Sequence, residues 1–373
     1  MSRASGSRPS IVHVMGWRSQ QYGSFERFLV AVARMCAEAG SETHLVFPEA
    51  PASAAFARDV EATIHHVPLA RHPADPRALR GLGRVLRAAR ATHLHAHFGL
   101  DAYLALAVGR ALGVEHRFTT KHITPGTSRL TMATARHRWL GRQVEVLFSV
   151  SERVRDDLIA LGVPAEKVVV AYLGVDPDAY RPDEERRRAA RESLGIGDDD
   201  RLVLSTSHMR PGKGVELLPK LAAELDRDPG RTVVVAAGDG PLRAELDRAA
   251  APLGDRLRVV GVREDVPELL AAADVFVFPT TGPEGLGLGA LEALASGTPV
   301  VVTAVSDLAA LAGDAALVVP PGDVDGLVEA CRRLLADPEL AAGYGRRGRA
   351  VVAGRLDVGA AAALHAEHYL GRR

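Results

Sequence analysis

Two glutamates flanking a glycine-rich stretch carry the strongest chemical signal in the 373-residue chain. Glu284 and Glu292 are separated by seven residues, within the segment FPTTGPEGLGLGALEALASGTPVV over 278–301. Because a carboxylate accepts two hydrogen bonds side by side, such a residue can bind the vicinal hydroxyls of a ribose or a hexose. The alternative for each residue taken alone is structural, with Glu292 on a solvated helix face and Glu284 as a partner of a helix dipole.

The glycines between these glutamates suit an anion. Residues 285, 287 and 289 are all glycine and lie where a loop meets a predicted helix. Without side chains they expose backbone N–H groups, and the positive end of the helix dipole lies at the same place. A diphosphate fits that combination. A glycine pattern by itself is weak evidence for a diphosphate site. The nearby glutamate pair makes the interpretation as a donor site more specific.

Short β-branched runs alternate with longer amphipathic stretches from end to end, a pattern that predicts βαβ units and parallel sheets. The strands predicted before residue 176 are 11–15, 44–47, 92–96, 117–121, 146–150 and 168–172. Those predicted after residue 200 are 202–205, 232–236, 257–260, 275–278, 300–302 and 316–319. A polar, proline-containing and highly charged segment over 176–200 separates the two series.

The predicted fold class is therefore α/β, with two Rossmann-like domains whose parallel sheets face a central cleft. The domains are expected over 1–175 and 201–355, joined by a linker over 176–200. A final helix over 356–373 has no strand after it to pack with, and we expect it to cross back to the first domain. Sheets of this kind bind ligands at the carboxyl ends of their strands.

Composition excludes several classes of protein. Hydrophobic residues make up 47% of the chain and charged residues 25%, as in globular proteins, and no apolar run is long enough to span a bilayer. A formal net charge of zero argues against a dedicated nucleic-acid binder. With only Cys36 and Cys331, neither a disulfide framework nor a cysteine metal site is supported. The polar start of the sequence does not resemble a signal peptide, so a cytoplasmic location is expected.

The chain resembles the retaining glycosyltransferases of family GT4, which have the GT-B fold. The spacing Glu-x7-Glu followed by ASGTPVV is similar to the signature of that family. Three further stretches agree in order and spacing. They are MRPGKGVELL over 209–218, similar to a phosphate-binding lysine-glycine turn, AGDGPLRAEL over 237–246, similar to the GDGP turn, and GVR over 261–263, similar to a base-binding loop.

The resemblance implies an activity and a set of residues. A hexose-type sugar would move from a UDP or GDP donor to a small-molecule, glycan or lipid-linked acceptor, with retention, without metal and without cofactor. Glu284 would contact the transferred sugar, Glu292 the donor ribose and Lys213 the diphosphate. The donor-binding residues so implied are Arg210, Lys213, Gly238, Val262, Arg263, Glu284, Gly285, Leu286, Gly287, Leu288 and Glu292, and the catalytic ones are His97, Lys213 and Glu284.

One position departs from the family pattern. Five residues before Lys213, where the family usually has arginine, this sequence has His208, and Arg210 follows two positions later. Either Arg210 takes over that charge, or the diphosphate relies on Lys213 and the helix N-terminus. The structural alternative for Lys213 is a solvated lysine in a turn.

Alternating histidines mark the first domain. His93, His95 and His97 fall on one face of a predicted strand, a spacing that invites a metal interpretation. No cysteine or carboxylate partner is evident, so no metal site is predicted. By resemblance, His97 meets the sugar, and His122 faces the cleft. The alternative is that both histidines are core or loop residues satisfied by the backbone.

The same resemblance places an acceptor loop early in the chain. The paired glycines of the family are represented there by Gly23, followed by Ser24 and Phe25 in place of a second glycine. The acceptor-binding residues implied are thus Gly23, His97 and His122.

Two further patterns are interpreted as structural. Asp198 to Asp200 contains an Asp-x-Asp, the metal motif of the other glycosyltransferase fold, but its place in the linker favours a solvated acidic turn. Four arginines over 77–87 lie opposite leucines at helical spacing. That stretch is compatible with peripheral contact to an anionic membrane, although a plain solvated face is favoured.

By resemblance, catalysis consists of positioning and charge stabilisation. The acceptor attacks the front face of the anomeric carbon while the donor phosphate leaves and takes the acceptor proton, and Lys213 with the helix end stabilises the departing charge. Two other classes stay open at this point. A nucleotide-sugar 2-epimerase shares the fold, and the altered positions 208 and 24 are compatible with a non-catalytic donor-binding protein.

Overall fold

Two parallel sheets organise the chain. The computed structural model describes residues 8–69, 75–97, 101–123 and 131–371. Its residues divide into unit 1, Met1–Leu173 with Val358–Arg373, and unit 2, Gly174–Asp357. Each unit is a parallel sheet covered by helices, which confirms the predicted α/β class of two Rossmann-like domains.

Unit 1 contains a seven-stranded sheet in the order β3-β2-β1-β4-β5-β6-β7. Its strands are β1 Ser10–Met15, β2 Glu42–Phe47, β3 Thr63–His66, β4 His93–His97, β5 His116–Lys121, β6 Val146–Ser149 and β7 Val168–Val170. Its helices are α1 Ser24–Glu38, α2 Ala54–Asp59, α3 Pro76–Ala88, α4 Asp101–Ala111, α5 Thr131–Gln143, α6 Glu152–Ala160 and α15 Val358–Leu370, with a 3-10 turn at Ala165–Lys167.

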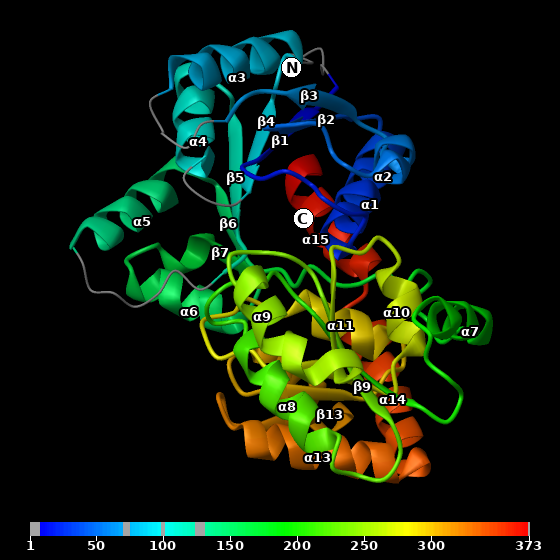
Figure 1. Cartoon of the computed structure of the whole chain (residues 1–373). Helices are drawn as coiled ribbons and strands as arrows, with labels where there is room; N and C mark the ends of the chain where they lie inside the picture. Colours follow the sequence, from blue (N-terminus) through cyan, green and yellow to red (C-terminus); the bar gives the residue numbers. More distant parts are fainter. Residues whose placement is uncertain (1–7, 70–74, 98–100, 124–130, 372–373) are drawn as a thin grey trace. The chain divides into compact units, whose positions relative to one another are not determined.

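The final helix of the chain packs in unit 1. Helix α15 lies against α1, while α3 and α4 pack together on the other side of the sheet (Figure 1). His365 and Tyr369 of α15 are buried, at 0% and 2% exposure, and they contact aromatic rings on the sheet. The helix thereby completes the layer that covers the central strands of unit 1.

Unit 2 contains a six-stranded sheet in the order β10-β9-β8-β11-β12-β13. Its strands are β8 Arg201–Thr206, β9 Thr232–Ala237, β10 Leu257–Gly261, β11 Val275–Phe278, β12 Val300–Thr303 and β13 Ala316–Val319. Its helices are α7 Glu184–Ser193, α8 Leu218–Leu225, α9 Arg243–Ala250, α10 Val266–Ala272, α11 Leu288–Ala295, α12 Asp307–Ala312, α13 Val324–Ala336 and α14 Pro338–Arg355. Three 3-10 turns, Val215–Leu217, Ala251–Arg256 and Gly313–Ala315, complete it.

Every strand predicted from the sequence is present. The central strands of unit 2 are valine-rich because both faces are buried, and β9 and β11 are buried at every position. One strand was not predicted. The edge strand β3, TIHH, is only partly buried. With one threonine and two histidines in four residues, it lacks the β-branched apolar run by which the other strands were predicted.

Helix α7 lies in the segment interpreted from sequence as a linker, and the structure assigns that segment to unit 2. The helix docks largely through arginine, and Ala190 is its one buried apolar residue. Arg187 donates to Asp274 at 2.6 Å, and the buried Arg191 donates to the same carboxylate at 3.3 Å. Because hydrogen bonds replace a hydrophobic stripe here, hydrophobic periodicity could not reveal this helix.

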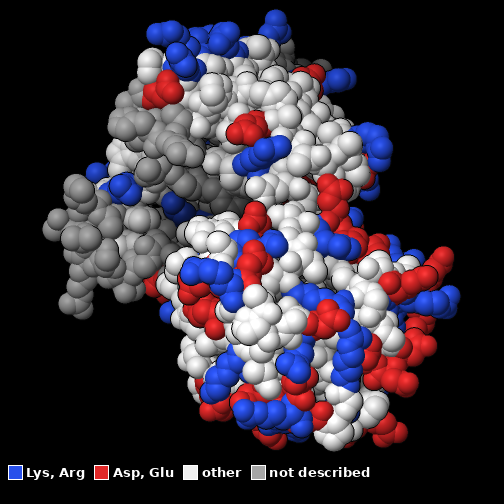
Figure 2. All heavy atoms as spheres, in the orientation of Figure 1, with Lys and Arg blue, Asp and Glu red and all other residues white. Residues whose placement is uncertain are grey.

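The basic stretch predicted at 77–87 forms α3. Its four arginines are exposed, and Figure 2 shows basic side chains gathered over the end of unit 1 where α3 lies. Among the described residues, no helix is both long and apolar enough to cross a bilayer.

Candidate functional site

An ion pair lies at the carboxyl ends of two adjacent strands in unit 2. Lys213 follows β8 and Glu284 follows β11, and these strands pair directly in the sheet. Their loops therefore meet, and the Nζ of Lys213 donates to Oε2 of Glu284. The side chains are 14% and 9% exposed. Lys213 is therefore not the solvated turn lysine of the structural alternative.

The turn that carries Lys213 requires glycine. Gly214 has φ +71°, and a Cβ at that position would lie 1.9 Å from the carbonyl oxygen of Pro279. The turn is also tied to the loop after β11, because the N–H groups of Thr281 and Gly282 both donate to the carbonyl of Gly212 at 2.9 Å. The Pro-Gly-Lys-Gly sequence thus places one cation against the second loop.

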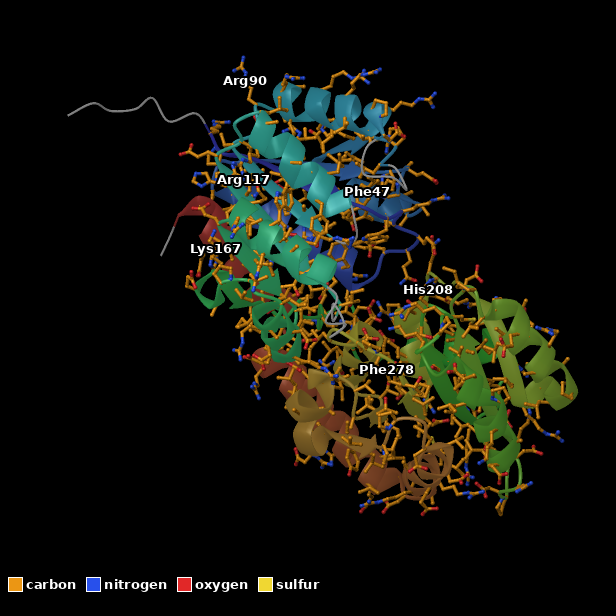
Figure 3. The ribbon with its side chains drawn as sticks, turned by 90° about the vertical axis from the view of Figure 1, so that its left-hand side faces the viewer. Phe47, Arg90, Arg117, Lys167, His208 and Phe278 are labelled. Carbon is orange, nitrogen blue, oxygen red and sulfur yellow. The ribbon has the colours of Figure 1, made fainter. Side chains whose placement is uncertain are left out.

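Glu284 is held at both oxygens. Its Oε1 accepts from the N–H of Gly285 at 3.1 Å, while Oε2 binds Lys213. The lysine Nζ also lies 5.5 Å from the ring centroid of Phe278, the last residue of β11, which Figure 3 labels. A half-buried cation, a fixed carboxylate and a glycine-rich loop are therefore combined in one place.

Glu292 is buried inside α11. The helix begins after Gly287, whose φ of +88° favours glycine, and Glu292 lies in its second turn with 8% exposure. Tyr180, which is 1% exposed, donates its hydroxyl to Oε1 of Glu292 at 3.1 Å. Burial contradicts the alternative of a solvated helix face. Sequence reasoning missed Tyr180, whose only signal is that it is the one aromatic residue of the segment 176–200.

The two residues proposed to replace the family's arginine both lie near the surface of unit 2. His208 is exposed (Figure 3), and its Nδ1 donates to the carbonyl of Asp239 at 2.7 Å. Arg210 is half-buried and donates to the carbonyl of Pro211 at 3.4 Å. In both contacts the acceptor is a backbone carbonyl and not a carboxylate.

The remaining predicted donor-binding residues surround the ends of β9, β10 and β11. The N–H of Gly238 donates to the carbonyl of Gly261 at 2.7 Å, which joins the GDGP turn to the GVR loop. In that loop Val262 is 44% exposed and Arg263 binds Asp265 through two hydrogen bonds, at 2.7 and 2.5 Å. Gly285 and Leu286 are buried, and Leu288 is half-buried at the start of α11.

The histidines of unit 1 form a stack against the core. His13 of β1 and the strand residues His95 and His97 are all 0% exposed. Their ring centroids are 4.0 to 5.4 Å apart, with small interplanar angles. Burial lowers the pKa of His13 to about 3 and the pKa of His97 well below its ordinary value, with a smaller contribution from neighbouring imidazoles. These rings are therefore neutral at physiological pH.

Side chains, rather than the backbone, satisfy these rings. Nδ1 of His13 lies 3.1 Å from Nε2 of His97, and Nδ1 of His97 lies 3.3 Å from Nε2 of His122. His95 binds Thr120 at 2.7 Å through Nε2 and the hydroxyl of Tyr369 through Nδ1. His93 is separate from this group and stacks on His116 at 4.4 Å.

One group in the described part of the chain has the composition of a metal site. The ligand atoms of His13, His95 and His97 lie within 4.8 Å of one another. The alternating histidines of β4 are visible in the sequence, but His13 joins them only through the pairing of β1 with β4. The hydrogen bonds described above occupy both ring nitrogens of His95 and of His97, and Nδ1 of His13.

Gly23 caps α1 at the other side of this stack. Its N–H donates to Oε2 of Glu26 at 3.1 Å, and Oε1 of that buried glutamate accepts from Ser19 at 2.7 Å. The loop before α1 is thus held by a carboxylate. Phe25, which replaces the second glycine of the predicted loop, packs edge-on against His97 and His122 at 5.6 and 5.3 Å.

Two family descriptions match the chain. The family described as "Glycosyltransferase Family 4" matches residues 25–179, and the family described as "Glycosyl transferases group 1" matches residues 200–337. The two matches fall in units 1 and 2 respectively, apart from the last few residues of the first.

Similar proteins agree with these matches. The chain is 35% identical over 267 residues to a GDP-mannose-dependent alpha-(1-6)-phosphatidylinositol monomannoside mannosyltransferase of Mycolicibacterium smegmatis, covering 68% of this chain and 70% of that protein. It is 32% identical to the alpha-D-kanosaminyltransferase of Streptomyces kanamyceticus, covering 66% and 69%. The fold resembles that of Anabaena HepE in complex with UDP and glucose, with a TM-score of 0.80, 20% identity and coverage of 98% and 100%.

Proposed function

Because the chain belongs to glycosyltransferase family 4 and has the GT-B fold, we propose that it transfers a hexose-type sugar from a UDP- or GDP-sugar with retention and without metal. The acceptor is a small molecule, a glycan or a lipid-linked molecule. The observation that carries the proposal is the Lys213 to Glu284 ion pair beside the glycine-rich loop and the buried Glu292.

The named relatives limit the donor without fixing it. The mycobacterial relative is named as GDP-mannose-dependent, whereas HepE was solved with UDP and glucose. Val262, half-exposed beside the GDGP turn, offers an apolar surface for either base, and we assign base contact to the loop of Val262 and Arg263. The name of the mycobacterial relative gives phosphatidylinositol monomannoside as its acceptor, and for this chain acceptor identity is open within the three classes above.

Each part of the donor is assigned to one group of residues. Glu292, oriented by Tyr180, accepts hydrogen bonds from the ribose hydroxyls. Lys213 and the N–H groups over 285–288 bind the diphosphate, and Glu284 binds the sugar hydroxyls. Since Lys213 is already paired with Glu284, the diphosphate enters a site in which the cation is oriented before the ligand arrives.

The chemical step needs no enzymic nucleophile. The acceptor hydroxyl oxygen forms a bond to the anomeric carbon on the face from which the phosphate departs, the bond from that carbon to the phosphate oxygen breaks, and the acceptor proton passes to the leaving phosphate. Lys213 stabilises the negative charge that grows on the diphosphate. His97 is assigned to orient the transferred sugar, with Gly23 and His122 on the acceptor side.

A donor screen tests the proposal. We expect UDP-sugars or GDP-sugars, but not dTDP-sugars, to raise the melting temperature of the protein and to be consumed, and chelator to leave turnover unchanged. Lys220→Ala is a matched control for Lys213→Ala, because Lys220 is exposed and pairs only with Asp325 among the described residues. Failure of all donors to bind, turnover abolished by chelator and restored by a divalent ion, or release of a 2-epimerised donor would contradict it.

A further inference from the structure

Three imidazoles from neighbouring strands form a hydrogen-bonded series in unit 1. His13 lies in β1, His97 ends β4, and His122 follows β5. The distance from Nδ1 of His13 to Nε2 of His97 is 3.1 Å, and the distance from Nδ1 of His97 to Nε2 of His122 is 3.3 Å. His97 therefore uses both ring nitrogens within the series, and His13 is its inner neighbour.

The two hydrogen bonds of the series must point the same way. A neutral imidazole has one N–H donor and one lone pair. Burial keeps all three rings neutral, because it lowers the pKa of His13 and of His122 to about 3 and the pKa of His97 well below its ordinary value. If His13 donates, all three rings carry their proton on Nδ1. If His122 donates, all three carry it on Nε2.

The inner end of the series decides between these directions. Nε2 of His13 is buried and has no hydrogen-bond partner within the described part of the chain. When the series runs outward from His13, that atom is an acceptor lone pair. When it runs inward, the same atom is a buried N–H without an acceptor. Among backbone groups, unpaired buried N–H donors are rarer than unpaired acceptors, and we apply the same preference to this ring.

We propose that His13 is a positioning residue that fixes His97, and His122 through it, as the Nδ1–H tautomer. The functional part of this inference rests on the proposed role of His97 in orienting the sugar. A sugar hydroxyl that takes the place of His122 in the series would then always meet an N–H donor on His97. A ring with a mobile proton would present a donor to some molecules and an acceptor to others.

The geometry favours hydrogen bonds over a metal ion at this place. Among the three clustered histidines, His95 already has both nitrogens bonded, to Thr120 and to Tyr369. Nδ1 of His13 and Nε2 of His97 face each other at a distance typical of a hydrogen bond. Binding one ion through all three rings would therefore break at least one hydrogen bond of His95 and one of His97.

Imidazole nitrogen NMR of the full chain tests the tautomer directly. In protein labelled with ¹⁵N-histidine, the ring shifts and couplings distinguish the two neutral tautomers and the imidazolium, and His97→Gln identifies the His97 signals. We expect Nδ1–H in the wild type. His13→Asn places an amide nitrogen near the former Nδ1 and should retain that state, whereas His13→Leu removes the donor and should lose it. His13→Phe, which keeps a ring, replaces His13→Leu if the latter does not fold.

Kinetics measured on the same variants distinguish the effect of His13 on the tautomer of His97 from the proposed role of His97 in orienting the sugar. With UDP- or GDP-sugar, His13→Leu should lower kcat by roughly 10- to 100-fold with little change in nucleotide affinity, and His13→Asn should recover most of the loss. A tautomer that changes while kcat does not would support the assignment of His13 and remove His97 from the sugar site. A wild-type His97 in the Nε2–H state, a tautomer unchanged in folded His13→Leu, or a stoichiometric divalent metal lost in that variant would overturn the inference.

Discussion

The Nζ of Lys213 and the carboxylate of Glu284 form a direct ion pair although the residues are 71 positions apart in the sequence. The pairing of β8 with β11 brings their loops together, and the glycine turn at 212–214 holds the lysine against the second loop. In the free protein the cation is therefore neutralised by a residue assigned to the sugar. A bound donor has to share it, and this relationship determines how the variants below should behave.

Lys213→Ala should lower kcat more than donor affinity, because the lysine interacts most strongly when negative charge has moved onto the leaving phosphate. Loss of one such group typically costs on the order of 10²-fold in rate. Steady-state kinetics with Lys220→Ala as the control check this expectation. Near wild-type kcat in a folded Lys213→Ala protein would remove Lys213 from the diphosphate.

Arg210→Ala and His208→Ala distinguish the two candidates for the missing arginine. If Arg210 has taken that role, Arg210→Ala should resemble Lys213→Ala in its loss of kcat, and His208→Ala should have little effect. The side chain of Arg210 favours this outcome, because its hydrogen bond within the described part of the chain is to the carbonyl of Pro211 and not to a carboxylate. The reverse ranking of the two variants in kcat would assign the phosphate to His208 instead.

Substitution of the two glutamates should affect ligand binding differently. Glu292→Ala should weaken the donor and the free nucleoside diphosphate alike, since the ribose is present in both, and Glu284→Ala should weaken only the donor. Tyr180→Phe removes one hydrogen bond to Glu292 at 3.1 Å and should reproduce part of the Glu292→Ala loss, about threefold to tenfold in Kd. Calorimetric titration measures all three. Equal nucleotide affinities for the two glutamate variants, at equal stability, would count against the division.

Unit 1 should lose stability in mild acid before unit 2 does. Burial lowers the pKa of His13 and His122 to about 3 and that of His93 and His365 to about 4. Between the unfolded value near 6.5 and these folded values, the unfolded chain binds more protons, so stability falls as pH falls through that window. Each such ring contributes a slope of up to about 1.4 kcal/mol per pH unit.

Fluorescence can follow this loss in one unit alone. Both tryptophans of the chain, Trp17 and Trp139, lie in unit 1, and His208 is the only histidine in unit 2. Thermal melts followed by tryptophan emission should shift to lower temperature from pH 7 to pH 5, by more than the unit 2 transition seen by circular dichroism. An unchanged tryptophan transition over that range would show that the imidazoles titrate normally.

Local patterns were sufficient to predict every described strand except β3, together with the loops that follow these strands. Every predicted strand is present, since valine-rich runs over 233–236 or 275–278 follow from burial of both faces of a parallel sheet. The positions of Lys213 and Glu284 in loops after predicted strands also follow from such patterns, whereas their direct contact depends on the pairing of β8 with β11. The functional roles of these residues are a separate matter that the variants above address.

Contacts that depend on the three-dimensional pairing of distant segments could not be predicted. Tyr180 donates to Glu292 although the two residues are 112 positions apart in the sequence. Tyr180 belongs to a segment whose composition predicts a polar linker, and no sequence pattern indicates the contact. His13 joins the histidines of β4 only because β1 lies beside β4 in the sheet order. Helix α7 was missed for a related reason. It is attached to the domain by hydrogen bonds from its arginines to Asp274, and these leave no hydrophobic periodicity in the sequence.

Retention of configuration is the most direct test of the central claim, that a donor held by Lys213, Glu284 and Glu292 is attacked on the face its phosphate leaves. Proton NMR of slow donor hydrolysis, recorded with an α-linked UDP- or GDP-sugar before mutarotation, identifies the first anomer released. We expect the α-anomer first, at a rate that falls on the order of 10²-fold in Lys213→Ala and is unchanged in Lys220→Ala. Initial appearance of the β-anomer would contradict it.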